Sequence, residues 1–137
     1  MPPVIMTAIV GTTKSLKDEL AKILRPPKFW IVSAKSSLTE LGSVDFPQNN
    51  PSLLIIEATE SPQLLIAQIA ALKQQHQRVR IILLGRQLQL TEIDAAFRAG
   101  INAYFAGELP SAEFLRALDL IVLGRHSTKP GTRAMPR

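Results

Sequence analysis

The sequence predicts one α/β domain in which five parallel strands alternate with five helices. Short apolar runs of strand length recur along the chain, and a stretch with apolar residues at helical spacing follows each of them. The links between these segments are short, which favours a parallel sheet with right-handed crossovers and helices on both faces. The chain has 137 residues, of which 46% are hydrophobic and 20% charged, so it can bury one core.

The predicted elements follow in a regular order. The strands are expected at residues 4–10, 29–32, 53–56, 79–84 and 103–105. The helices are expected at residues 16–24, 36–41, 62–76, 93–100 and 110–124, and residues 46–52 form a loop. The first helix begins behind Thr12 or Thr13 as a cap and stops at Pro26 and Pro27, whereas Gly42 and Gly100 end later helices.

The simplest arrangement of these elements is a flavodoxin-like, (βα)5 doubly wound parallel sheet with strand order 2-1-3-4-5. In such a sheet the functional crevice lies at the carboxyl ends of the strands. That edge would gather the residues that follow four strands, which are 11–13, 57–60, 85–86 and 107–108. We therefore expect one candidate site there.

Several classes of function are not expected. The chain has no cysteine, which excludes disulfides and thiolate metal sites, and its two histidines, His76 and His126, lie far apart in sequence. No apolar run approaches the length of about 20 residues that crosses a membrane, and the start lacks a secretory signal, so a cytoplasmic protein is expected. The turn after the first strand lacks the glycine spacing of phosphate-binding loops. We expect no metal, no cofactor and no enzymatic activity.

The positive charge is concentrated at the C-terminal end. The net charge is +5, and Arg125, Lys129, Arg133 and Arg137 lie in a stretch without acidic residues. We expect a domain at residues 1–124 and a flexible basic tail at residues 125–137. Weak nucleic-acid binding through this tail is one alternative function. Binding of a small ligand in the strand-end crevice is another.

Two stretches of the chain have a recognisable pattern. Residues 80–84 followed by residues 95–105, which end in Ala-Gly-Ile-Asn-Ala-Tyr-Phe, resemble the receiver domain of bacterial response regulators, most of all the LuxR/NarL type. Residues 51–56 resemble the run before the phosphorylated aspartate of that family. The resemblance covers residues 4–124 and implies a part in two-component signal transduction, with regulation of transcription as the output.

The resemblance also places the family's chemical groups on this chain. Glu57 stands at the position of the phosphorylated aspartate, Gly11 and Thr12 at the acid pair that holds Mg²⁺, Gly85 at the hydroxyl residue and Gly107 at the lysine. All five positions depart from the family's pattern. We therefore expect a pseudo-receiver that takes no phosphoryl group and acts by binding partners.

Two interpretations of Glu57 remain open from the sequence. It either mimics a permanently phosphorylated aspartate or is a strand-end acid that pairs with Lys14 or Arg86 and has no signalling role. The first interpretation needs other groups that sense the carboxylate, and the magnesium site and the lysine that would do so are missing.

The candidate interaction face lies on the last two predicted helices and the strand between them. Its residues are Arg98, Tyr104, Glu113, Arg116 and Asp119. We expect a protein partner or a homodimer through this face or through the first and last helices, although the charges also suit a solvated surface. Tyr104 suits either a partner surface or core packing, whereas Phe105 should point to the opposite face and pack in the core. DNA would be bound only through an output domain that is absent from this chain, and no membrane is involved.

Overall fold

The computed structural model describes residues 5–26, 28–40, 52–58, 61–85, 88–106 and 111–122. Its strands are β1 (Ile5–Val10), β2 (Phe29–Lys35), β3 (Ser52–Glu57), β4 (Arg80–Gly85) and β5 (Ala103–Ala106). Its α-helices are α1 (Lys14–Ile23), α2 (Pro62–Gln75), α3 (Leu90–Ala99) and α4 (Ser111–Val122), and a 3-10 turn, η1, spans Leu38–Glu40. No helix in this part of the chain is long and apolar enough to cross a membrane.

The strands form one parallel sheet in the order β2-β1-β3-β4-β5, which confirms the predicted topology. The central strands are buried on both faces because helices cover each of them, and Leu53 to Ile56 of β3 have no exposed surface. This double burial is the reason that β3 and β4 appear in the sequence as unbroken apolar runs rather than as alternating patterns.

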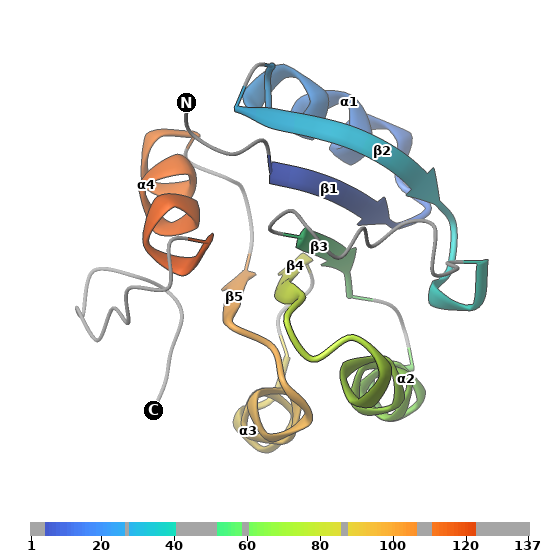
Figure 1. The fold of residues 1–137 in the computed structure, drawn as a ribbon. Coiled ribbons are helices and arrows are strands. Elements are labelled where there is room, and N and C mark those ends of the chain that lie inside the picture. The colour runs from blue at the N-terminus through green and yellow to red at the C-terminus, as the bar shows by residue number, and fades with distance from the viewer. Residues whose placement is uncertain are drawn as a thin grey trace.

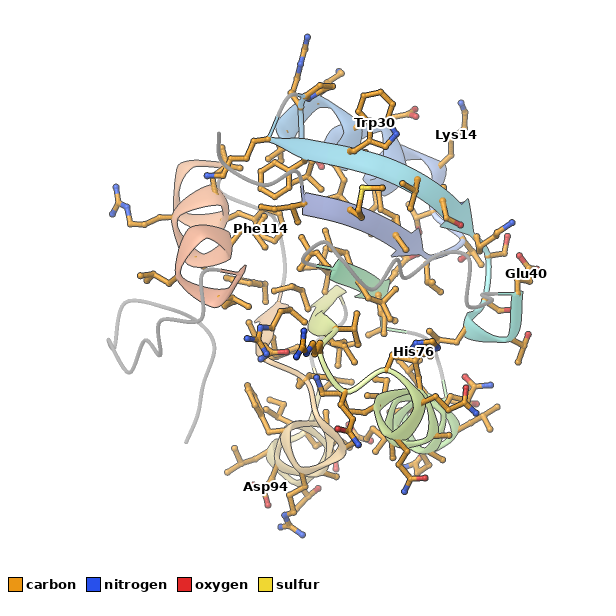
Figure 2. The ribbon with its side chains drawn as sticks, in the orientation of Figure 1. Lys14, Trp30, Glu40, His76, Asp94 and Phe114 are labelled. Atoms are coloured by element: carbon orange, nitrogen blue, oxygen red, sulfur yellow. The ribbon has the colours of Figure 1, made fainter. Side chains whose placement is uncertain are left out.

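The helices form a layer on each face of the sheet, with α1 and α4 on one face and α2 and α3 on the other (Figure 1). On the first face Phe114 of α4 meets Phe105 of β5 edge to face, with ring centroids 5.4 Å apart. In Figure 2 Phe114 points from its helix toward the sheet. Phe105 is 6% exposed, so its predicted place in the core is confirmed.

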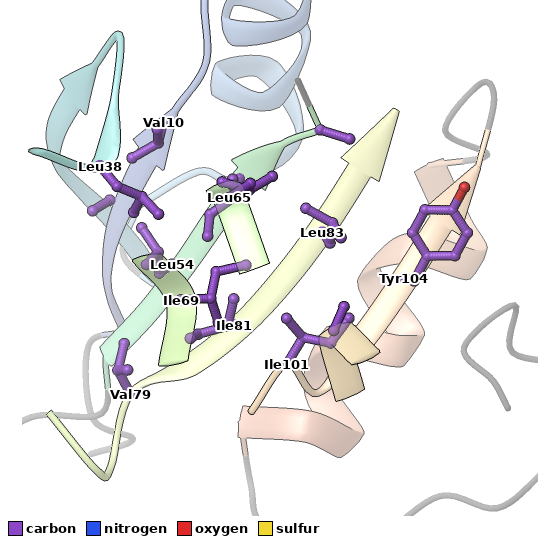
Figure 3. Packing of buried hydrophobic residues seen from close by; sticks show 14 residues of the cluster. Val10, Leu38, Leu54, Leu65, Ile69, Val79, Ile81, Leu83, Ile101 and Tyr104 are labelled. Atoms are coloured by element: carbon purple, nitrogen blue, oxygen red, sulfur yellow. The ribbon is translucent and has the colours of Figure 1, made fainter. Parts of the chain in front are cut away.

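The second face is built from the alternate residues of the same strands (Figure 3). Leu54, Ile81 and Tyr104 lie in this cluster, together with Leu65 and Ile69 from α2. Tyr104 and Phe105 therefore point to opposite faces, as the alternation of strand residues predicts.

The prediction of a short helix at residues 36–41 is wrong in part. Strand β2 continues to Lys35, and only the single 3-10 turn η1 follows within the described residues. The amide of Ser36 donates to the Glu40 carboxylate at 3.2 Å, and the hydroxyls of Ser37 and Thr39 bond each other, so side chains compete with the helical pattern. Leu38 is buried and fixes the turn on the core. Residues 41–51, including Gly42 and most of the expected loop, lie outside the described residues.

The turn between α3 and β5 depends on Gly100. Its φ is +125°, where a residue with a side chain is strained, and a β-carbon there would lie 2.8 Å from Cγ of Lys73. Lys73 packs its stem against this turn while its ammonium group donates to the carbonyls of Gln77 and Val79. Burial, together with the charge of Arg80, lowers the pKa of the Lys73 amine. The glycine therefore lets α2 and α3 pack closely at the amino ends of the strands.

Gly100→Ala should lower the free energy of unfolding by about 1–2 kcal/mol from the left-handed backbone alone, and further because of the contact with Lys73. Urea denaturation followed by circular dichroism measures this loss. In a Lys73→Ala background the steric part should disappear and the backbone part should remain. An unchanged stability in Gly100→Ala would contradict this account of the turn.

Candidate functional site

Of the residues expected around one crevice, those that the structure describes come together at the carboxyl edge of the sheet. Strands β1, β3 and β4 are neighbours, with Val10 opposite Ile56 and Glu57 opposite Leu84. Parallel strands in this register end side by side, so Gly11, Glu57 and Gly85 lie next to one another. Gly107 and Arg86 lie outside the described residues.

The carboxylate of Glu57 is bound by the chain itself. Its Oε1 accepts hydrogen bonds from the amide of Thr12 at 2.9 Å and from the amide of Thr13 at 3.1 Å. Its Oε2 accepts a hydrogen bond from the Thr13 hydroxyl. These three donors belong to one short segment between β1 and α1, so the side chain of Glu57 bends from the end of β3 toward the start of α1.

Glu57 thereby supplies the hydrogen-bond acceptor at the start of α1 that the side chain of the cap residue does not supply. Thr13 is the N-cap residue, as the sequence predicted, but its hydroxyl makes no capping bond within its own helix. The first turn of a helix carries amide groups without internal partners and a partial positive charge, and both favour an anion. A carboxylate 44 residues further along the chain provides that anion.

The hydrogen bonds also favour the charged form of the carboxyl group. Burial on its own would raise the pKa of Glu57, but the Thr13 hydroxyl, the amides of Thr13 and Thr12 and the charge of Lys17 bring the pKa below its ordinary value. Glu57 is therefore an anion at neutral pH, and the helix terminus stabilises this anion.

Two glycines lie beside the Glu57 side chain, and Gly11 makes room for it. A β-carbon at Gly11 would lie 2.6 Å from Oε1 and 2.9 Å from Cβ of Glu57, which are distances that real atoms do not adopt. Gly85 has φ +109°, and a β-carbon there would touch Cγ of Glu57 at 3.8 Å. The side chain that the family pattern has at position 11 is therefore incompatible with the position that Glu57 adopts.

The expected ion pair of Glu57 with Lys14 does not form. Lys14 projects from α1 (Figure 2), and its ammonium group lies 3.8 Å from the Asp18 carboxylate, one helical turn away. The cation whose charge acts on Glu57 is Lys17. Lys14 was the wrong choice because the side chain of Glu57 points to backbone amides, which sequence reasoning did not consider as partners.

The residues that the structure describes at this edge do not fit a magnesium ion. Both oxygens of the Glu57 carboxylate face hydrogen-bond donors, and the amide groups of a helix terminus repel a cation. Mg²⁺ needs several oxygen ligands in octahedral geometry. Across the residues that the structure describes, no group of three or more acidic or histidine side chains could hold a metal ion.

The candidate interaction face is described only in part. Arg98 forms an ion pair with Asp94 on the same helix, and Arg116 is exposed on α4. Tyr104 is 6% exposed and packs in the core, and its hydroxyl accepts a hydrogen bond from the amide of Leu88 at 2.9 Å. The side chains of Glu113 and Asp119 lie outside the described part of the chain. The face remains a prediction.

Sequence reasoning missed the role of Thr13 and Lys17 at this site. One signal could have revealed it, because the predicted strand order placed the end of the third strand next to the end of the first. An acid at the end of the third strand then lies beside the start of the first helix, where an anion is favoured.

Comparison with known proteins shows the fold. No protein-family model matches the chain, and no curated protein does. The response regulator ChrA of a heme-sensing two-component system matches with a TM-score of 0.66 and 15% identity over 95% of this chain. A LuxR-family two-component response regulator from Aurantimonas sp. SI85-9A1 matches with a TM-score of 0.72 and 18% identity, again over 95% of this chain.

The chain corresponds to 62% of the length of ChrA and to 91% of the length of the Aurantimonas protein. These identities are too low to show more than the architecture. The fold is that of a response-regulator receiver domain, as the resemblance in the sequence implied.

A double-mutant cycle tests the steric link between Gly11 and Glu57. Gly11→Ala should lower the free energy of unfolding by about 1–3 kcal/mol, because the new β-carbon displaces the Glu57 side chain from its donors. In a Glu57→Gly background most of this cost should disappear, since the atoms that clash are gone. Chemical denaturation of the four proteins gives the coupling. Equal costs of Gly11→Ala in both backgrounds would show that the two residues do not interact.

Proposed function

We propose that this chain is a receiver-type module of two-component-type signal transduction that binds protein partners without aspartyl phosphorylation. The observation that supports this most is the internal binding of the Glu57 carboxylate by Thr12 and Thr13. A carboxylate that is to attack a phosphoryl donor needs a free oxygen, and both oxygens of this one already accept hydrogen bonds from the chain.

The surroundings of Glu57 favour the same conclusion. Phosphoryl transfer needs positive charge or metal ions that stabilise the transferred group, together with precise positioning. Gly11 and Thr12 offer no carboxylate for a metal, and Gly85 offers no hydroxyl. We therefore infer that the module is not an enzyme and does not phosphorylate itself.

Glu57 acts in this proposal as a structural anion and not as a mimic of a phosphorylated aspartate. A mimic would have to be sensed by groups that change position with the signal. The hydrogen bonds to Glu57 come from the segment that opens α1, and this segment is fixed to the sheet by the bond from the Gly11 amide to the Lys35 carbonyl at 2.9 Å. The contact joins β3 to the start of α1.

The output of the module is a further part of the proposal. Relatives in fold include a LuxR-family response regulator, and regulation of transcription in the bacterial cytoplasm is the role that suits such a module. DNA would then be contacted by another domain, with which this module associates. Association with protein, either a partner or a second copy, is the direct activity of the chain.

The proposal predicts no response to a mimic of phosphorylation. An amide NMR titration of the chain with Mg²⁺ and beryllofluoride, which imitates a phosphorylated aspartate in working receivers, should leave Thr12, Thr13, Glu57 and Gly85 unshifted. The Glu57→Asp variant should also stay silent, because the missing metal ligands are not restored. Titration with Mg²⁺ alone serves as the control for ionic strength. Saturable shifts at these amides in the unaltered chain would sink the proposal.

A further inference from the structure

The outward face of α2 carries no charge. Its exposed positions are Gln63, Leu64, Ala67, Ala71, Gln74 and Gln75. The charged residue of this helix, Lys73, is half-buried and turns its ammonium group back to the carbonyls of Gln77 and Val79. The other α-helices in the described part of the chain all have exposed charges, for example Lys22 on α1, Arg98 on α3 and Arg116 on α4.

Leu64 is an unusual residue at such a position, because it is 60% exposed on a helix whose apolar side is already packed against the sheet through Leu65 and Ile69. Ala67 and Ala71 follow it at spacings of three and seven residues, so the three side chains share one stripe of the helix. The stripe has a large residue at one end and a small residue at the other.

This distribution of sizes is complementary to itself. When two copies of α2 lie antiparallel about a two-fold axis between Ala67 and Gln68, Leu64 of each copy lies over Ala71 of the other. Large residues then fill the space above small ones, and the alanines at the centre allow the helix axes to approach closely. The glutamines at the rim keep their amides near water.

Charge also favours a second copy over other occupants. An acidic or basic partner finds no charge of opposite sign on this face, whereas a second α2 is equally neutral. Contact through a neutral face avoids the cost of removing ionised groups from water, in keeping with the depletion of charge at interface cores.

We propose that two copies of this chain associate through the outward faces of α2, with Leu64, Ala67 and Ala71 at the centre of the contact. This inference specifies the partner in the proposed function of an interaction module and rests on that function. The face is distinct from the two that the resemblance to receiver domains suggests, because α2 contributes to neither of them, although it lies beside α3 (Figure 1).

Sedimentation velocity over a range of concentrations tests the association. The unaltered chain should form a reversible dimer, and Leu64→Glu and Ala71→Glu should each weaken it at least about tenfold, because each places a charge in the contact. Ala21→Glu is the matched control, since Ala21 is also an exposed alanine within a helix, on α1. This control should leave the dissociation constant within about twofold of the original. Circular dichroism verifies that each variant folds.

Disulfide trapping tests the geometry independently. The chain contains no cysteine, so Ala67→Cys introduces one thiol close to the proposed two-fold axis. Mild oxidation should give a covalent dimer of this variant and little or none of Ala21→Cys. Equal cross-linking of the two variants, or a chain that stays monomeric at every concentration, would overturn the inference.

The two proposals can fail separately. A dimer that persists in Leu64→Glu and Ala71→Glu would overturn the α2 contact and leave an interaction module with a different face. Shifts with beryllofluoride would overturn the proposed function even if the dimer through α2 exists.

Discussion

The contact between the Glu57 carboxylate and the first turn of α1 determines how the functional edge of this protein is built. The carboxylate comes from the end of the central strand β3, and its donors come from the segment that links β1 to α1. The side chain can reach them only because position 11 has no β-carbon. One anion therefore joins the middle of the sheet to the first helix, and the helix terminus that would attract another anion is already occupied.

This contact gives the small residues at the carboxyl edge of the sheet a structural role. Gly11 and Thr12 are both part of the arrangement that holds Glu57. Gly11 supplies space, Thr12 supplies an amide and Gly85 adopts a backbone conformation that side chains rarely allow. The carboxyl edge of this receiver-like fold is built around an internal carboxylate. In the proposed function the surface of the molecule binds partners, and we propose the neutral face of α2 as the contact with a second copy.

The sequence predicted the sheet well and the contacts of the site poorly, for physical reasons. Strands β3 and β4 are buried on both faces, so each appears in the sequence as a continuous apolar run that predicts a strand. The predicted strand order in turn brings Gly11, Glu57 and Gly85 together. The prediction of a short helix at residues 36–41 was wrong in part because the serines and the threonine of that segment form hydrogen bonds with nearby groups. Lys14 and Arg86 were the expected partners of Glu57, and the amides and hydroxyl that bind it were missed because only charge pairing was considered. The exposure of Leu64 could not be deduced either, because α2 is apolar on nearly all sides.

The central claim is that the Glu57 carboxylate is held as an anion by the start of α1, and a pH titration of its carboxyl carbon by ¹³C NMR tests this most directly. A lowered pKa in the folded state means that the contact stabilises the fold above the pKa of the unfolded chain. This stabilisation is lost as the pH falls through the pKa of the folded state. We expect the pKa of Glu57 to lie below its ordinary value of 4.5 and to rise in Thr13→Val, which lacks the hydroxyl donor. A pKa of Glu57 at or above 4.5 that Thr13→Val leaves unchanged would contradict the account.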